Sequence, residues 1–280
     1  MKNISSTIIE PATAVIGEKL AGRVALVTGG TRGIGAAICR SLASQGASLA
    51  AGYSGNKDLA DQFVKEFERD FDGTGRASIH QGNVSQPEDC RRVVQEVLDE
   101  HGRIDILVNN AGITMDKMAM KMTVEEQWNE VIAVNLSGSF YMAQPVLEHM
   151  VERGTGRIIF VSSVVGETGN IGQANYAASK AGMLGLTKTL AKETAFILAR
   201  AGKLVDNGVG ITVNTVTPGF VATEMIENVP EKGLDKIKST IPVGRLCHPE
   251  EIARVVHNLA ADASAYITGQ VWGVNGGLDM

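Results

Sequence analysis

Cysteine is scarce in this chain, with only Cys39, Cys90 and Cys247 among 280 residues. The three stand far apart and form no CxxC pair, so the sequence suggests neither a zinc knot nor a disulfide framework. We therefore expect no bound metal. A chain with so few thiols fits the reducing cytoplasm.

Long apolar runs are also missing. None approaches the length that spans a membrane, and the first 22 residues interrupt short apolar pairs with Ser, Thr, Glu and Pro. The sequence thus excludes a signal-peptide core and a membrane partner. We interpret residues 1–22 as an N-terminal extension that either frays or packs on a neighbouring surface.

An excess of positive charge is lacking too. The 26 Lys and Arg residues face 31 Asp and Glu residues, for a net charge of -5, which argues against nucleic acid as the main partner. With 44% hydrophobic residues the chain can bury a sizeable core, and no composition break marks a second domain. We expect a single domain over residues 23–280.

Short apolar runs alternate with longer stretches of helical spacing. The runs predict buried strands at 24–28, 47–51, 77–79, 104–108, 158–161, 211–216 and 270–274. The stretches predict helices at 34–44, 59–71, 87–100, 125–151, 176–198 and 250–259. This alternation predicts an α/β fold, a Rossmann-type doubly wound sheet of seven parallel strands with helices on both faces.

Two segments look inserted into this pattern. Residues 194–208 prolong a helix into a loop, and residues 220–242 join the sixth strand to a later helix. Because ligands bind at the carboxyl ends of parallel strands, we expect residues 220–242 to act as a mobile substrate lid.

A glycine-rich turn links the first strand to the first helix. Residues Thr28 to Gly35 read Thr-Gly-Gly-Thr-Arg-Gly-Ile-Gly. Glycines there allow a tight turn and let the backbone approach a pyrophosphate at the helix N-terminus. The turn predicts a dinucleotide site, although by itself it also suits a merely structural turn.

The end of the second strand carries no carboxylate. Where an NAD site places an acid for the ribose hydroxyls, this chain reads Gly52-Tyr-Ser-Gly-Asn-Lys57. Arg32 and Ser54, with Lys57, could instead bind a 2′-phosphate through charge-assisted hydrogen bonds. The sequence therefore favours NADP(H), with NAD held by hydroxyls and backbone as the alternative.

Tyr176 and Lys180 are four residues apart on a predicted helix and so share one face. A free tyrosine titrates near 10, and a nearby ammonium lowers the pKa of the phenol. The spacing suits acid–base chemistry but also occurs by chance on helix surfaces.

Several motifs together resemble the short-chain dehydrogenase/reductase family. They are the glycine turn at 28–35, Asn109-Asn-Ala-Gly112, Asn135, Ser163 thirteen residues before Tyr176, Tyr176-x-x-x-Lys180 and Pro218-Gly219. The resemblance covers about residues 20–280. It implies that Tyr176 protonates a substrate carbonyl, that Ser163 hydrogen-bonds the same oxygen, that Lys180 lowers the pKa of the tyrosine and holds the nicotinamide ribose, and that Asn135 anchors a water.

The resemblance also implies a set of cofactor contacts along the carboxyl edge of the sheet. They comprise Gly29, Thr31, Arg32, Gly33, Ile34, Gly35, Ser54, Asn83, Val84, Asn109, Ala111, Gly112, Tyr176, Lys180, Pro218, Gly219, Val221 and Thr223. Many family members have Asp in place of Asn83, whose amide oxygen could still accept from the adenine amino group. Each of these residues could also serve only to shape a turn of the backbone.

Within the family the chain is most similar to 3-oxoacyl-[acyl-carrier-protein] reductases and acetoacetyl-CoA reductases. The likeness implies NADPH-dependent reduction of a 3-oxoacyl thioester, with Gln173, Phe220 and Met225 lining the substrate site. Some segments favour one carrier and some the other, so coenzyme A and acyl carrier protein both remain open. An acidic carrier protein could dock on Arg153 or Arg200.

Two alternatives remain. The same four residues could serve a dehydrogenase of a sugar alcohol, a steroid or another secondary alcohol, or the chain could be a catalytically silent cofactor-binding protein. The resemblance further implies a homotetramer formed through the helices at 125–151 and 176–198 and through the C-terminal segment.

Overall fold

A computed structural model describes residues 17–71, 76–204, 210–223 and 231–280. Most of the expected N-terminal extension, the end of the 194–208 insertion and Met225 of the expected lid lie outside the described residues. Within the described part, no helix is long and apolar enough to cross a membrane.

Seven parallel strands form one sheet in the order β3-β2-β1-β4-β5-β6-β7. The strands are β1 (Val24–Val27), β2 (Ser48–Tyr53), β3 (Ala77–Gln81), β4 (Ile106–Asn109), β5 (Gly156–Val161), β6 (Ile211–Pro218) and β7 (Val271–Val274). The order reverses between β1 and β4, the place where such sheets open a crevice for ligands. The predicted fold class is confirmed.

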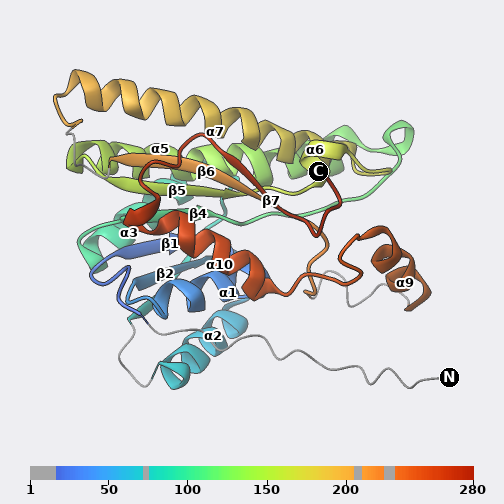
Figure 1. The fold of residues 1–280 in the computed structure, drawn as a ribbon, viewed down its shortest axis with the longest axis horizontal. Helices are drawn as coiled ribbons and strands as arrows, with labels where there is room; N and C mark the ends of the chain where they lie inside the picture. The colour runs from blue at the N-terminus through green and yellow to red at the C-terminus, as the bar shows by residue number, and fades with distance from the viewer. Residues whose placement is uncertain (1–16, 72–75, 205–209, 224–230) are drawn as a thin grey trace.

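Helices cover both faces of the sheet (Figure 1). One buried cluster joins the sheet to α1 (Gly33–Ala43), α2 (Lys57–Asp70) and α10 (Pro249–Ala260). The opposite cluster joins it to α3 (Pro87–His101), α5 (Gly138–Arg153) and α7 (Ala174–Arg200). Because both faces are buried, the strands read as continuous apolar runs rather than as alternating ones.

The predicted helix at 125–151 is divided in the structure. It consists of a π-helical η2 (Val124–Trp128), α4 (Asn129–Ile132), a second π-helical η3 (Ala133–Ser137) and then α5. A π-turn widens the helix locally and is frequent at functional sites. The second one carries Asn135, one of the four predicted catalytic residues.

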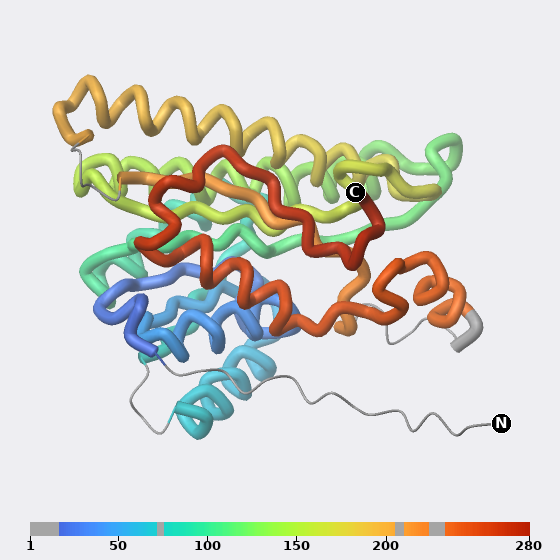
Figure 2. The backbone as a smooth tube through the Cα atoms, viewed as in Figure 1, coloured from blue at the N-terminus to red at the C-terminus, as the bar shows by residue number. Residues whose placement is uncertain are grey.

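Three short elements and one longer helix were not expected from the sequence: η1 (Ala119–Lys121), α6 (Val165–Thr168), η4 (Asp262–Ser264) and α9 (Glu231–Thr240). Figure 2 shows α9 standing apart from the two helical layers, on the side of the molecule where the strands end. It occupies the second half of the segment predicted as a lid.

Candidate active site

The glycine turn is tightly fitted to its surroundings. Gly29 adopts a positive φ of +61°, a conformation that other residues rarely take. At Gly35 an added Cβ would overlap the Gly29 carbonyl oxygen and stand 2.7 Å from Asn110 Nδ2. Only glycine therefore lets the start of α1 approach this turn.

Asn110 holds the turn to the end of β4. Its Nδ2 donates to the carbonyls of Thr28 (3.0 Å) and Gly29 (3.1 Å), and its backbone N–H donates to Thr28 Oγ1 (3.0 Å). The N–H of Ala111 donates to the same hydroxyl at 3.0 Å. These bonds close the point where the strand order reverses. Asn110 was absent from the predicted site, although the Asn-Asn-Ala-Gly motif contains it.

The predicted phosphate-binding residues lie at neighbouring strand ends. Gly30 N–H donates to the Gly52 carbonyl at 2.9 Å, which places the turn that carries Arg32 beside the strand end that precedes Ser54. Arg32 and Ser54 are both exposed. Lys57 pairs with Asp61 at 2.7 Å one helical turn along α2.

One buried polar atom at the carboxyl edge has no partner among the described residues. Asn109 is 1% exposed at the end of β4, and its Nδ2 makes no hydrogen bond. A buried donor left unpaired costs free energy, roughly 1–3 kcal/mol. Together with the glycine turn, this donor fits a bound dinucleotide with acceptor groups. Gly112 adds to the fit, since a Cβ there would come within 3.4 Å of Lys180 Nζ.

Asn83 is held differently from the expectation. Its Oδ1 accepts two hydrogen bonds, from the N–H of Ser85 at 3.0 Å and from its hydroxyl at 2.9 Å. An adenine contact through that oxygen would compete with this turn.

Val84 packs against the first turn of α5, where a Cβ on Gly138 would lie 2.8 Å from the Val84 carbonyl oxygen.

The segment after β6 approaches the glycine turn from the other side. A Cβ on Gly33 would lie 3.7 Å from Thr223 Cγ2, so these two predicted cofactor residues are close neighbours. Val221 is buried and pairs with Cys247 in an isolated parallel bridge. Gly219 has no room for a side chain, since a Cβ would meet the Asn275 carbonyl oxygen at 2.8 Å.

Tyr176 and Lys180 lie on the same face of α7, as their spacing predicted. Lys180 Nζ stands 5.6 Å from the centroid of the tyrosine ring and donates to the Val161 carbonyl at the end of β5 (2.8 Å). Burial lowers the pKa of Lys180 to about 8. The lysine is thus anchored to the sheet next to the phenol.

The pKa of Tyr176 is shifted in the direction opposite to the one expected. Burial raises it, the hydrogen bond with Ser163 lowers it and the negative charge of Asp116 raises it, so that the net shift is upward. In this geometry the phenol stays protonated at neutral pH, which is the form that a proton donor needs.

Asn135 holds the loop after β4 in place. Its Oδ1 accepts from Ile113 N–H at 2.9 Å, and its Nδ2 donates to the Ile113 carbonyl at 3.0 Å. The same Nδ2 donates to Ser179 Oγ at 3.0 Å, and that hydroxyl donates to the Tyr176 carbonyl at 2.8 Å. Ser179 thereby links two predicted catalytic residues. Sequence reasoning missed it, because a serine inside a helix carries no signal of its own.

Gln173, predicted to line the substrate site, precedes α7. Its Nε2 donates to both carboxylate oxygens of Asp116, at 3.0 and 3.1 Å, and its Oε1 accepts from Asn170 at 2.8 Å. Asp116 also acts on the pKa of Tyr176, so Gln173 lies close to the proposed proton donor.

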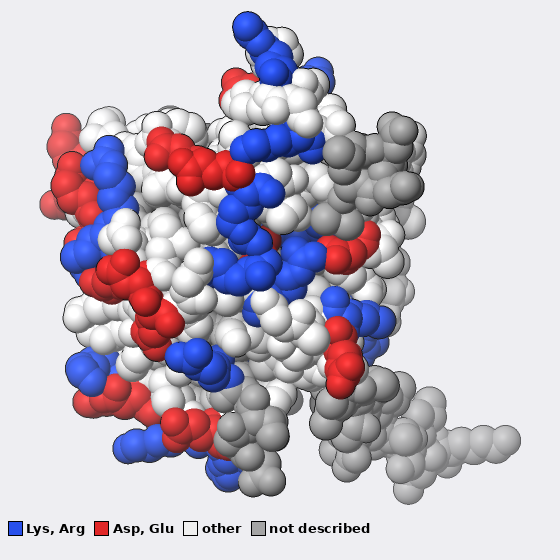
Figure 3. All heavy atoms as spheres, turned by 90° about the vertical axis from the view of Figure 1, so that its left-hand side faces the viewer, with Lys and Arg blue, Asp and Glu red and all other residues white. Residues whose placement is uncertain are grey.

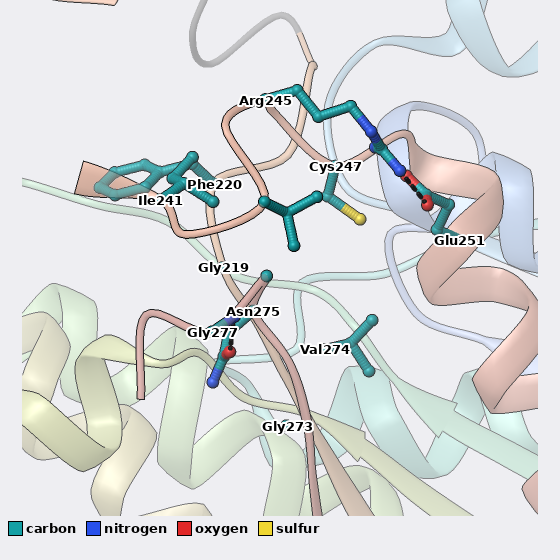
Figure 4. Close-up of a pocket in the computed structure, with 12 residues that line it drawn as sticks. Gly219, Phe220, Ile241, Arg245, Cys247, Glu251, Gly273, Val274, Asn275 and Gly277 are labelled. Carbon is teal, nitrogen blue, oxygen red and sulfur yellow. Dashed lines mark hydrogen bonds and ion pairs between the residues drawn. The ribbon is translucent and has the colours of Figure 1, made fainter. Parts of the chain in front are cut away.

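A pocket of about 250 Å³ opens at the carboxyl ends of β6 and β7. Phe220, the other described residue predicted to line the substrate site, borders it together with Ile241 and Cys247 (Figure 4). Arg245 closes one side through a bidentate ion pair with Glu251, at 2.7 and 2.8 Å. Its lining combines apolar side chains and glycine backbone with the polar side chains of Arg245, Glu251 and Asn275.

The arginines suggested as docking points for a carrier lie elsewhere. Arg153 donates to Asp105 at 3.0 Å, just before β4 begins. Figure 3 shows Lys and Arg side chains gathered on this face of the molecule, opposite the glycine turn. Arg200 ends α7, 24 positions after Tyr176, which corresponds to a helix rise of about 36 Å. Both arginines therefore lie away from Tyr176 within one chain, and docking of a carrier on them stays a prediction.

Comparisons with known proteins identify the family. The family model "short chain dehydrogenase" matches residues 23–233. The chain is 48% identical over 256 residues to "Acetoacetyl-CoA reductase" of Rhizobium meliloti, covering 91% of this chain and 98% of that protein. It is 46% identical over 260 residues to "3-oxoacyl-[acyl-carrier-protein] reductase FabG" of Thermotoga maritima, covering 93% and 99%. The FabG protein of Vibrio cholerae is 43% identical over 261 residues, with the same coverage. This chain is therefore an oxidoreductase that belongs to the short chain dehydrogenase family.

Proposed function

We propose that this enzyme uses NADPH to reduce a 3-oxoacyl thioester to the 3-hydroxyacyl thioester. The observation that carries the proposal is the half-buried Tyr176, hydrogen-bonded to Ser163 and adjacent to Lys180 at the carboxyl edge of the sheet. The relatives at 46–48% identity, named for acetoacetyl-CoA and for 3-oxoacyl-carrier-protein reduction, supply the substrate class.

In the proposed reaction NADPH, when bound, supplies a hydride to the ketone carbon. Tyr176 gives the proton of its hydroxyl to the ketone oxygen, and Ser163 donates a hydrogen bond to that oxygen as negative charge grows on it. Hydride and proton together account for the two hydrogens of the alcohol. Lys180, fixed to the Val161 carbonyl, retains N–H donors for the nicotinamide ribose.

The tyrosine assignment is tested with Tyr176→Phe, which keeps the ring and removes the proton. We expect NADPH oxidation with acetoacetyl-CoA to fall by at least a hundredfold, with NADPH affinity changed little. Unchanged turnover would refute the catalytic assignment. A wild-type enzyme that ignores 3-oxoacyl thioesters but oxidises a secondary alcohol with NADP would refute the substrate assignment instead.

The choice of NADPH over NADH rests on the missing acid after β2 and on Arg32 and Ser54 beside the glycine turn. One charge-assisted hydrogen bond contributes about 1.5–3 kcal/mol, roughly a tenfold to hundredfold change in Kd. Arg32→Ala should weaken NADPH binding by that factor and leave NADH binding unchanged. Lys57→Ala is the matched control, because that lysine is engaged by Asp61, and it should change neither affinity.

The carrier is settled by comparing rates on acetoacetyl-CoA and on the same acyl group attached to acyl carrier protein. The relatives do not separate the two, since their identities to this chain differ by only two percentage points. A kcat/KM at least tenfold higher on one carrier identifies the physiological thioester.

We also propose a homotetramer in the cytoplasm. Large apolar side chains on α5 and α7 are exposed in the single chain, including Phe140, Phe196 and Ile197. Trp272 on β7 is 41% exposed, which fits a second contact near the C-terminus. The three free thiols fit a reducing compartment. Light scattering should give about four chain masses, whereas a monomer mass would refute the assembly.

A further inference from the structure

Two histidines far from the proposed active-site tyrosine converge on one serine hydroxyl. Ser78 and His80 alternate along β3 and therefore project from the same face of the sheet. His101 is the last residue of α3, which packs on that face. The strand order places β3 at the edge of the sheet, so the cluster is buried but lies close to the surface.

The Nε2 atoms of both histidines face Ser78 Oγ. His80 Nε2 lies 2.8 Å and His101 Nε2 lies 2.7 Å from Ser78 Oγ. The Glu100 carboxylate spans both rings, with one oxygen 3.8 Å from His80 Nε2 and the other 3.9 Å from His101 Nε2. The side chains of both histidines are at most 5% exposed, and that of Glu100 is 47% exposed.

One hydroxyl connects the two rings. Ser78 Oγ has a single proton, yet it faces two ring nitrogens and also the Leu49 carbonyl oxygen at 3.3 Å. Either ring nitrogen can accept this proton or, as an N–H tautomer, donate to a lone pair of the oxygen. A cation between the rings would use the lone pairs of both nitrogens at once.

The spacing is close to that of a tetrahedral metal site. Zinc binds imidazole nitrogen at about 2.0–2.1 Å, so two ligand atoms of a tetrahedral ion stand roughly 3.3–3.5 Å apart. One ligand atom each from His80, Glu100 and His101 lies within 4.8 Å of the others, so a side-chain shift brings them to this distance. The half-exposed side chain of Glu100 can make that shift.

An outer carboxylate orients the first ring. His80 Nδ1 lies 3.3 Å from Glu96 Oε2, and Glu96 is itself held by Arg92 at 2.7 Å. Metal-binding histidines commonly donate their other ring N–H to a carboxylate in this way, which leaves the Nε2 lone pair for the metal.

We infer that His80, His101 and Glu100 bind a divalent transition metal of the Zn²⁺ type, with Glu96 orienting His80. A water completes four-coordination. The ion fastens the edge strand β3 to the end of α3. This inference does not depend on the proposed thioester reduction.

The test is Zn²⁺ titration of the full-length protein by calorimetry after removal of metal with a chelator. We expect saturable binding of one ion per chain, and strong visible absorption when Co²⁺ replaces Zn²⁺ in a tetrahedral site. His80→Gln and His101→Gln should each weaken binding at least tenfold. Glu96→Gln should weaken it roughly tenfold to hundredfold, as expected for an outer carboxylate.

His257→Gln is the matched control, because that histidine lies on α10 at the opposite face of the sheet. It should bind Zn²⁺ like the wild type. Glu100→Gln provides a second test with little risk to folding, since the side chain is half-exposed. Absence of saturable binding in the wild type, or equal binding in the His80, His101 and Glu100 variants, would overturn the inference. All variants should keep wild-type NADPH-dependent activity without metal.

Discussion

The fit of the glycine turn can be tested by adding a single carbon atom. In Gly35→Ala the new Cβ would overlap the Gly29 carbonyl oxygen and lie 2.7 Å from Asn110 Nδ2. Both neighbours are fixed, because Asn110 Nδ2 bonds the carbonyls of Thr28 and Gly29. The turn must therefore shift and release at least one of these bonds.

The magnitude follows from these contacts. Overpacking of this kind costs about 1–3 kcal/mol, and a lost hydrogen bond adds about 1 kcal/mol. We expect Gly35→Ala to lower the free energy of unfolding by roughly 2–4 kcal/mol, or about 5–15 °C in Tm. NADPH affinity should fall at least tenfold, because the same turn forms the predicted pyrophosphate site.

Gly185→Ala is the matched control. Gly185 is exposed in the middle of α7, and a Cβ there meets no atom within 4 Å. The same substitution should raise stability by about 0.5–1 kcal/mol, since alanine has the higher helix propensity. Thermal unfolding and NADPH fluorescence titration measure both variants. Equal Tm values for the two variants, or wild-type NADPH affinity in Gly35→Ala, would refute the argument from close packing.

Three further outcomes follow from the geometry. Burial lowers the pKa of Lys180 from 10.5 to about 8, so between these pH values the unfolded chain binds more protons than the folded one and stability should rise with pH. The rise in the free energy of unfolding, measured with urea, should be at most about 3 kcal/mol. Lys180→Met should abolish both this rise and the enzyme's activity. Burial opposes ionisation of Asp105, but hydrogen bonds from Arg103 and Arg153 bring its pKa below the ordinary value. Its contribution to stability is present above the unfolded pKa and lost as pH falls through the folded one, and Asp105→Asn should cost about 3–5 kcal/mol at neutral pH in the same assay. Ser179→Ala should lower kcat severalfold at constant KM and shift the pH profile of kcat, because the Tyr176 carbonyl loses the hydrogen bond from Ser179 Oγ. An unchanged pH profile would contradict a positioning role for Ser179.

Much of the architecture could be predicted from local pattern. Buried parallel strands need continuous apolar runs, and a helix needs its apolar residues at 3.6-residue spacing, so the alternation of β and α elements can be read along the chain. The glycine turn and the Tyr176–Lys180 pair are local as well, since each spans a few residues on one element. The helix containing Asn135 was predicted without its π-turns, because a change of one residue in the hydrogen-bond register leaves no clear mark in composition.

The chain sequence by itself therefore determined the fold class and the family, and it supplied the candidate site residues. Only the tertiary structure decided how those side chains are tuned: that Tyr176 carries a raised pKa, that Asn110 and Ser179 hold the site, that Arg153 stands at the opposite end of the sheet, and that His80 meets His101. The physical reason is the separation along the chain between the residues that interact. Periodicity and turn chemistry act between near neighbours in the chain, whereas burial, charge and hydrogen-bond partners depend on residues that the sheet brings together from distant segments.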